Sequence, residues 1–370
     1  MALALQNKVE QDGVMQFTIR GIDVSIINAI RRTILSDIPS VVFRGFPYSE
    51  NKITITKNTT RHTNEMVKQR LGCVPIHLKP DFPYSNYTVE LSSKNTGTGI
   101  IYATTGEFKI LDKTSGNYVS EVDTKKIFPP NAISKGFIPV VRLRNGPNNQ
   151  GEEIVLSCEL STGTGGQDGM YTVASQCFFT NTIDPAVNEE EWQNALKDIR
   201  ATTPDITEAQ VEKERRNWMF LEGKRHFIAN SFDFTLETIG VYTNDELVET
   251  ACTILLDKLN NLKTITQSDK LKIDASETTI DNCYDVILED EDYTIGNMLQ
   301  TVMFKELHER TKVLSFCGFK KFHPHDDHSV LRLAFVNDEP RHVINEYIVT
   351  MTENLTQQFS NVIKEFQSLK

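Results

Sequence analysis

The sequence lacks the patterns that mark small disulfide-rich, zinc-binding and membrane proteins. Its cysteines lie nineteen or more positions apart and form no CxxC pair; they are Cys73, Cys158, Cys177, Cys252, Cys283 and Cys317. This spacing predicts reduced, buried thiols and neither a metal nor another cofactor. No stretch approaches the ~18 apolar residues that span a bilayer, and the N-terminus shows no basic leader. We therefore expect an intracellular location, without secretion or membrane insertion.

A surplus of positive charge is also absent. The chain of 370 residues carries a formal net charge of −11. Proteins that hold DNA through its phosphates display a dense basic face, so we expect little or no direct DNA contact. An acidic total is more usual for a protein whose partners are other proteins. The length predicts two or three compact units.

Three short stretches each allow two interpretations. Residues 161–169 are glycine-rich but lack the Gly-Lys-Ser/Thr of a phosphate-binding loop, so a flexible loop is favoured over nucleotide binding. Residues 323–328 combine His and Asp, which suit zinc or manganese, but Pro and Asp are also expected in a hairpin turn. The acidic run 289–292 resembles the carboxylates of two-metal catalysis, yet it precedes a predicted helix, where negative charge is stabilising anyway.

A motif recurs 269 positions apart along the chain. Residues 23–30 read DVSIINAI and residues 292–299 read DYTIGNML, which share the pattern D-x-[ST]-I-x-N-x-[IL]. Ser25 or Thr294 is suited to cap a helix N-terminus, and the preceding Asp places negative charge beside the helix dipole. Two similar helices therefore begin the two halves of the chain.

Apolar residues at helical spacing predict four amphipathic helices. One lies early in each half, from Ile26 to Ile38 before Pro39 and from Ile295 to Leu307. One lies late in each half, from Leu247 to Leu262 and from Val343 to Phe366. The last helix, at some 28 residues, would run about 42 Å, longer than one small domain needs. Each apolar stripe either covers the core of its own domain, the commoner use, or packs against the other helices. The repeated order favours mutual packing.

Strand-like runs lie between these helices, so each half reads as a small α+β unit. They cover residues 15–19, 53–55, 227–235, 284–288, 313–318 and 330–336. Further short runs between the halves, at 87–91, 99–103, 137–142 and 153–160, predict a β-rich segment. Residues 184–220 turn charged and helical, with Trp192, Leu196 and Ile199 as a packing stripe.

Three sequence motifs resemble the α-like subunit family of multisubunit RNA polymerases. Residues 28–39, NAIRRTILSDIP, look like the signature helix of the bacterial α subunit and of the third-largest subunit of RNA polymerase II. Residues 58–60 and 70–76, NTT and RLGCVPI, are similar to the second motif of that family. Residues 288–299 resemble the small α-like partner, the eleventh subunit of RNA polymerase II. The resemblance covers about residues 14–80, 225–265 and 283–368.

The resemblance implies a division of the chain. An α-like dimerisation module would comprise residues 1–80 and 227–265, and a second would comprise 283–370. An inserted β-rich domain would occupy 81–226, and a tether 266–282. The fold class is then α+β, with the two modules joined as an intramolecular pseudo-twofold pair through a helical bundle. Many relatives bind zinc or an iron–sulfur cluster in the insertion, but its cysteines here have no near companions, so no metal is predicted.

The implied function is a non-catalytic assembly platform for the largest and second-largest polymerase subunits and for small zinc-binding subunits. Residues expected at the large-subunit interface are Asn28, Arg31, Arg32, Asn58, Thr59, Arg70 and Gly72. Residues expected to join the two modules are Ile27, Ile30, Ile34, Leu255, Leu259, Asn297, Leu299, Met303, Met351, Leu355 and Phe359. Gly163, Gly165 and Gly166 are expected in a loop that meets a partner subunit.

Some alternatives stay open at this point. Arg31 and Arg32 point about 100° apart on a helix, so they cannot both join one apolar face. Either both are solvated at the surface, or at least one of them docks on a large subunit. Two other functions are conceivable, a stand-alone enzyme that uses the glycine-rich stretch and a free transcription factor that binds nucleic acid. The fused arrangement resembles that of large cytoplasmic DNA viruses, which implies the host cytoplasm and the virion as locations.

Overall fold

The computed structural model describes residues 3–145 and 150–368. The chain divides into two compact units, which we describe separately. Unit 1 comprises Met1–Thr33, Gln176–Glu237 and Val248–Lys370, and unit 2 comprises Ile34–Ser175 and Thr238–Leu247. Both units mix helices with antiparallel sheets, so the fold is of the α+β type.

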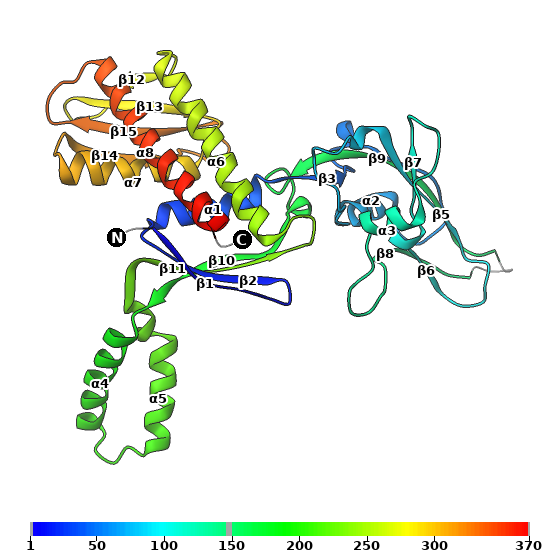
Figure 1. Cartoon of the computed structure of the whole chain (residues 1–370), viewed down its shortest axis with the longest axis horizontal. Coiled ribbons are helices and arrows are strands. Elements are labelled where there is room, and N and C mark those ends of the chain that lie inside the picture. The colour runs from blue at the N-terminus through cyan, green and yellow to red at the C-terminus, as the bar shows by residue number, and fades with distance from the viewer. Residues whose placement is uncertain (1–2, 146–149, 369–370) are drawn as a thin grey trace. The chain divides into compact units, whose positions relative to one another are not determined.

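Unit 1 contains two four-stranded sheets (Figure 1). The first has the order β1-β2-β11-β10, with β1 (Ala4–Gln11), β2 (Val14–Arg20), β10 (Ala174–Ile183) and β11 (Phe227–Thr238). The second has the order β12-β13-β15-β14, with β12 (Ile273–Ala275), β13 (Cys283–Glu289), β14 (Leu314–Lys320) and β15 (His328–Phe335).

The two sheets have the same topology. In each, an edge strand precedes a strand that runs into a helix, and two further strands then lead into a second helix. The helices are α1 (Val24–Ser36) and α6 (Asn244–Gln267) in the first half, and α7 (Tyr293–Met303) and α8 (Arg341–Ser368) in the second. A short π-helical turn, η7 (Phe304–Arg310), extends α7. The internal repeat seen in the sequence is therefore also a repeat of topology.

The repeated motif starts a helix in both halves, but the capping residue differs from the one predicted. The Asp292 carboxylate caps α7 by accepting the backbone N–H of Thr294 at 2.7 Å. The Asp23 carboxylate likewise accepts the backbone N–H of Ser25 at 2.8 Å and its hydroxyl at 2.6 Å. The prediction of Ser25 or Thr294 as the cap was thus wrong, because the aspartate two residues earlier reaches the free N–H groups first.

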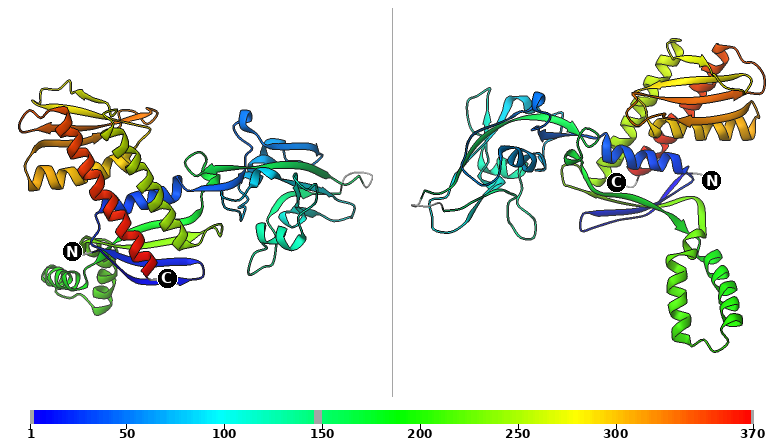
Figure 2. Two further views of the ribbon diagram at one scale, coloured as in Figure 1. Left: turned by 45° about the horizontal axis from the view of Figure 1, so that its top comes forward. Right: turned by 180° about the vertical axis from the view of Figure 1, so that it is seen from behind.

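The two late helices lie side by side within unit 1 (Figure 2). Lys263 of α6 forms an ion pair with Glu353 of α8 at 2.8 Å. Helix α8 is 28 residues long and buries one stripe of apolar side chains along its whole length, from Ile344 to Phe366. Such a continuous stripe stabilises a helix through packing rather than through propensity.

A helical hairpin joins β10 to β11. It consists of α4 (Pro185–Thr202) and α5 (Glu208–Phe220), followed by the turn η6 (Glu222–Arg225). The Asp184 side chain caps α4, and Thr207 with Gln210 forms a capping box at α5. Trp192 of α4 is buried against Trp218 of α5, their ring centroids 6.0 Å apart.

Unit 2 is built around the long strand β9 (Glu153–Thr164), which pairs antiparallel with three other strands. These are β3 (Pro39–Phe43), β4 (Ile53–Asn58) and β5 (Tyr87–Lys94); β7 (Lys109–Asp112) lies beyond β5. A separate ribbon pairs β6 (Ile101–Thr104) with β8 (Pro139–Leu143). The helices are α2 (Asn64–Gly72) and α3 (Glu121–Ile127).

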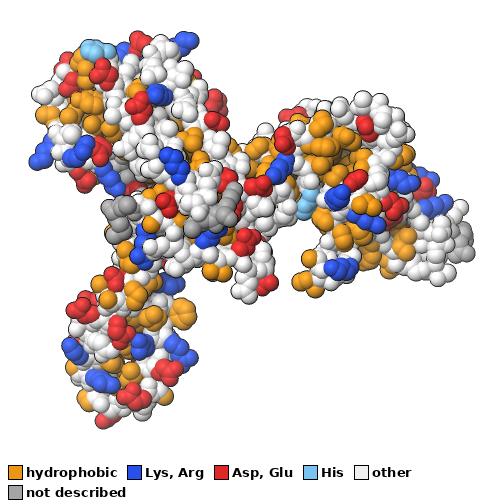
Figure 3. All heavy atoms as spheres, in the orientation of Figure 1, with side chains coloured by type: hydrophobic (Ala, Val, Ile, Leu, Met, Phe, Trp, Pro, Cys, Tyr) orange, Lys and Arg blue, Asp and Glu red, His pale blue; other side chains and the backbone are white. Residues whose placement is uncertain are grey.

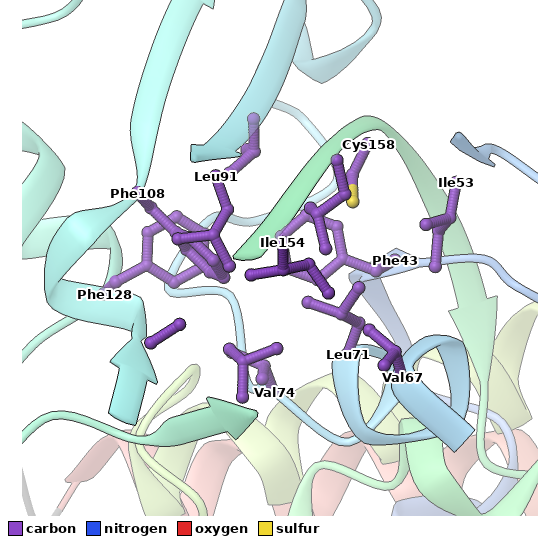
Figure 4. Packing of buried hydrophobic residues seen from close by; sticks show 14 of the residues in the cluster. Phe43, Ile53, Val67, Leu71, Val74, Leu91, Phe108, Phe128, Ile154 and Cys158 are labelled. Carbon is purple, nitrogen blue, oxygen red and sulfur yellow. The ribbon is translucent and has the colours of Figure 1, made fainter. Parts of the chain in front are cut away.

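The core of unit 2 joins the strands to α2 (Figure 4). Phe43 stacks parallel to Phe128 at 6.0 Å, and Phe108 meets the Phe128 ring edge-on at 4.9 Å. Val67 and Leu71 of α2 are fully buried in the same cluster. Aromatic pairs at these distances add to the hydrophobic stabilisation of a core.

The compact units differ from the predicted domain boundaries. Residues 39–80, expected in the first module, lie in unit 2, because β3 and β4 pair with β9. Residues 176–226, expected in the insertion, lie in unit 1. The predicted tether 266–282 is also not wholly irregular, since residues 273–275 form β12, which pairs with β13. In the described part of the chain, no helix combines the length and apolarity needed to cross a membrane.

Candidate protein interface

Each repeated N-cap aspartate is bound by a cation from the opposite half of the chain. Arg32 of α1 donates to the Asp292 carboxylate at 2.5 Å and to the Thr294 hydroxyl at 2.9 Å. Lys305, just after α7, forms an ion pair with Asp23. These reciprocal contacts connect the first helix of each half to the other half.

Both aspartates keep a charge that suits these partners. Partial burial tends to raise the pKa of Asp292, but hydrogen bonds from Thr294 and the charge of Arg32 lower it overall. Partial burial also tends to raise the pKa of Asp23, but hydrogen bonds from Lys305 and Ser25 lower it overall. Both carboxylates therefore stay ionised at neutral pH and hold both cations.

A second repeat, which sequence reasoning missed, supports the same two helices. The Cys177 thiol donates to the carbonyl oxygen of Arg31 at 3.7 Å, and the Cys317 thiol donates to that of Gln300 at 3.7 Å. The strands β10 and β14 carry these cysteines in a shared pattern, S-x-C-x-F, at residues 175–179 and 315–319. Burial raises the pKa of both thiols to about 12, so they are inert side chains that fix each helix on its sheet.

The apolar residues predicted to join the two modules are all buried, and all but one of them lie in unit 1. They are Ile27, Ile30, Ile34, Leu255, Leu259, Leu299, Met303, Met351, Leu355 and Phe359; only Asn297 among the predicted set is half-buried, and Ile34 falls just across the boundary in unit 2. A contact between the halves occurs at the end of α8, where Phe366 meets the ring of Phe17 in β2 edge-on at 5.1 Å. Lys8 of β1 lies over the same Phe366 ring.

A shallow hollow of about 280 Å³ lies between α1 and α7. Equivalent residues of the two repeats line it, among them Ser25 with Thr294 and Asn28 with Asn297. The hollow is therefore lined from both halves, and its lining mixes polar and apolar residues.

The two adjacent arginines of α1 have different surroundings. Arg32 is engaged by Asp292 and Thr294 inside the chain. The Arg31 side chain hydrogen-bonds within its own helix: its Nε and a terminal nitrogen donate to the Asn28 side-chain oxygen at 3.1 and 3.0 Å. The Arg31 guanidinium is thus oriented and has no carboxylate partner among residues 3–145 and 150–368.

The second motif shapes a turn and a helix inside unit 2. The Asn58 amide donates to the carbonyl of His62 and to the Asn64 side chain, both at 2.9 Å. The Thr59 hydroxyl accepts the N–H of Glu153 at 2.8 Å, which ties the turn to β9. These bonds are internal, so their role at a partner interface stays a prediction.

Two other motif residues also make close internal contacts. Arg70 donates to the carbonyls of Val140 and Pro139 at 2.7 and 2.8 Å, which joins α2 to β8. A Cβ at Gly72 would lie 2.3 Å from the sulfur of Met170, so no larger residue fits without a shift. Contact of Arg70 or Gly72 with a partner subunit stays a prediction.

The glycine-rich stretch is more ordered than a flexible loop. Gly163 pairs with Ser40 as part of β9, and a Cβ there would lie 2.7 Å from the Tyr171 ring. A Cβ at Gly165 would lie 2.2 Å from the carbonyl oxygen of Leu35, and Gly166 donates its N–H to Ser36 at 2.7 Å. Close packing explains these glycines, on the Tyr171 ring for Gly163 and on the end of α1 for Gly165 and Gly166. Contact of the stretch with a partner stays a prediction.

The remaining alternatives resolve in part. Residues 323–328 form the connection between the antiparallel strands β14 and β15, as the hairpin interpretation predicted. In the acidic run, Asp292 caps α7, as the helix interpretation implied. Within the described ranges, no three His, Cys, Asp or Glu side chains are grouped so as to hold a metal ion. All six thiols are free, and only Cys73 is exposed.

Comparison with known families places the chain in one of them. The family model described as the RNA polymerase Rpb3/Rpb11 dimerisation domain matches residues 16–259. The chain belongs to this family. The matched range of the Rpb3/Rpb11 dimerisation domain includes α1, the reciprocal cation Arg32 and most of α6.

Several characterised proteins are similar to this Rpb3/Rpb11-type chain. DNA-directed RNA polymerase subunit Rpo3 of Pyrococcus furiosus is 22% identical over 268 residues, which cover 67% of this chain and 91% of that protein. Rpo3 of Methanothermobacter thermautotrophicus is 23% identical over 300 residues, covering 71% and 98%. DNA-directed RNA polymerases I and III subunit rpac1 of Dictyostelium discoideum is 25% identical over 285 residues, covering 68% and 78%.

Proposed function

We propose that the chain is a non-catalytic assembly-platform subunit of a multisubunit DNA-directed RNA polymerase. The observation that carries this proposal is the family match over residues 16–259. The similar polymerase subunits also align with this chain over most of their own length. The protein contributes surfaces and not chemistry. Its role is to bring the two catalytic subunits together for transcription.

The platform is an intramolecular pair of two α-like modules related by a pseudo-twofold axis. Support comes from the matching order of strands in the two sheets and from the reciprocal pairs Arg32–Asp292 and Lys305–Asp23. In an isologous interface equivalent residues make equivalent contacts. Here the equivalent Asp23 and Asp292 each meet a cation from the opposite half, although Arg32 and Lys305 are offset from one another by four positions in the repeat. Fusion in one chain raises the effective concentration of the second module to ~mM, so pairing needs no bimolecular search.

The composite surface around α1 then binds the second-largest and afterwards the largest polymerase subunit. Arg31 is the better candidate for this contact than Arg32, because Asn28 orients its guanidinium while Arg32 is already engaged. A planar guanidinium held in this way suits a carboxylate or backbone carbonyls of a partner. Unit 2 carries the motif residues Asn58 and Arg70 and contacts further subunits, among them small zinc-binding ones, and little or no DNA.

The fused arrangement is also the basis for the proposed source and location. Two α-like modules in one chain resemble the polymerases of large cytoplasmic DNA viruses. The protein would then act in the host cytoplasm and be packaged in the virion. Immunodetection in purified particles tests this point separately from the polymerase role.

Co-purification tests the platform role. The buried residues Ile30 and Leu299 are each replaced by Asp in the tagged chain, and Val336, an exposed residue of similar size, is replaced by Asp as the control. A buried unpaired charge disrupts packing, so the two core variants should recover no large subunits, whereas the control recovers them in one-to-one amounts. Intact complexes with both core variants would refute the proposal.

Two measurements on the isolated chain separate the alternative functions. A stand-alone enzyme that uses residues 161–169 would bind nucleotide, and the platform should not. A transcription factor would bind DNA with strong salt dependence. The net charge of −11 opposes such binding.

A further inference from the structure

The hairpin of α4 and α5 is an addition to the repeated fold. It fills residues 184–226 between β10 and β11, whereas the equivalent strands β14 and β15 are joined by residues 321–327 alone. The repeat therefore closes without such a hairpin, and the extra residues need another reason to be present.

The base of the hairpin is rigid where it meets β11. The Asn188 amide donates to the carbonyl of Gly223 at 2.5 Å, and the Asp184 N–H donates to that of His226 at 3.0 Å. The Trp218 ring stacks on His226 with the centroids 5.8 Å apart. Side chains carried here are held in place before any partner arrives, which lowers the entropic cost of binding.

Large apolar side chains nevertheless face solvent at this rigid base. Phe220 and Leu221 are each 69% exposed, and Met219 before them and Phe227 after the turn are exposed as well. We call these four residues the base patch. Figure 3 shows hydrophobic side chains at the sheet end of the hairpin and mixed charges towards its tip. Contiguous exposed apolar residues of this size mark interaction sites.

Positive charge surrounds the base patch. Residues 213–226 contain five Lys and Arg but two Glu, although the whole chain carries −11. Arg215 and Arg225 are engaged by Glu189 and Glu222. Arg216 and Lys224 have no carboxylate partner in the described part of the chain, and Lys224 lies over the Phe220 ring. Arg216 and Lys224 therefore place positive charge beside the apolar residues, and Lys213, one turn earlier on α5, adds to it.

We propose that the base patch docks an acidic, amphipathic segment of another protein. Apolar anchors of that segment would cover Phe220 and Leu221, and its carboxylates would pair with Arg216 and Lys224. Electrostatic complementarity of this kind sets the orientation and the association rate, while the buried anchors supply the affinity.

Other occupants fit the base patch less well. Of the four residues only Phe220 and Phe227 have rings that stack on bases, and the few cations without a carboxylate partner are too sparse to track a phosphate backbone. Segments that bind anionic bilayers carry clusters of roughly 4–8 Lys or Arg, more than the cations left without a carboxylate partner beside the base patch. The proposal is independent of the polymerase role, since it rests on the hairpin alone.

Fluorescence anisotropy with the full chain tests the proposal. The probe is a fluorescein-labelled synthetic peptide of about 20 residues, with Phe and Leu at helical i, i+4 spacing and Glu elsewhere. Replacing Phe220 and Leu221 together by Ser should weaken binding about tenfold or more, as should replacing Arg216 and Lys224 together by Glu. A peptide with Lys in place of Glu should not bind.

The equivalent connection in the second half supplies a matched control. Phe322 is 58% exposed and Lys320 lies over its ring, as Lys224 lies over Phe220. Replacing Lys320 by Glu and Phe322 by Ser should leave the affinity unchanged. The proposal fails if the acidic peptide does not bind, if this control weakens binding as much, or if a 20-nucleotide RNA or anionic vesicles bind more tightly than the peptide.

Discussion

Substitution of Phe366 by Ala should destabilise the protein strongly, although this residue lies in the last turn of the final helix. The side chain is 1% exposed and packs edge-on against Phe17 of the first sheet. Truncating a buried Phe to Ala costs about 3–5 kcal/mol in a well-packed core. A helix end relaxes more easily than a core centre, so we expect the lower figure, about 3 kcal/mol.

Urea denaturation followed by circular dichroism measures this loss. With a slope of roughly 2–3 kcal/mol per M, a loss of about 3 kcal/mol lowers the midpoint by roughly 1–1.5 M. Gln367→Ala is the control, because the neighbouring side chain is exposed and its loss should change stability by less than about 0.5 kcal/mol.

A double-mutant cycle with Phe17→Ala assigns the loss to the contact between the halves. The coupling free energy of the two rings should be about 0.5–1.5 kcal/mol. The reasoning is refuted if Phe366→Ala unfolds at the same urea concentration as Gln367→Ala, since α8 would then not hold the first sheet.

Three further predictions concern charge, packing and thiols. The pKa of Asp292 is lowered in the folded protein, so the ionised carboxylate stabilises the fold. The stability advantage of wild type over Asp292→Asn should be complete at pH 6 and should vanish as the pH falls below about 4 through the folded pKa. Unfolding free energies measured over this pH range check the prediction. Gly296→Ala should cost about 1–3 kcal/mol, because the new Cβ would lie 2.0 Å from the Phe319 ring, and a thermal melt unchanged from wild type would contradict it. Ellman's reagent should titrate one thiol, Cys73, in the native chain and six after denaturation, and fast reaction of several native thiols would argue against the buried positions.

Local signals in the sequence predicted the helices well. The stripe that begins after Pro340 predicted a final helix of some 28 residues, and α8 spans Arg341–Ser368. The repeat at 269 positions predicted two equivalent helices, and α1 and α7 both follow a capping aspartate. Capping and periodicity act over a few residues, so they can be read from a single chain.

Non-local pairing set the limits of prediction. Residues 39–58 join unit 2 because β3 and β4 find their partner in β9, about a hundred residues later, and no local pattern specifies that register. The spacing between cysteines does not reveal the S-x-C-x-F repeat, because that pattern lies in the residues next to Cys177 and Cys317. Gly165 is required by the backbone carbonyl of Leu35, far away in sequence, which composition does not reveal.

The unequal lengths of the two equivalent connections have a practical consequence. Residues 37–173 fill the first, between α1 and β10, while residues 311–313 fill the second, between η7 and β14. The first connection shows that the repeated fold accepts an insertion of more than a hundred residues between its early helix and the next strand. A fluorescent or affinity domain grafted at Lys312, an exposed residue with positive φ, should therefore be tolerated. The repeat thus marks a place at which the molecule can be labelled without touching either terminus.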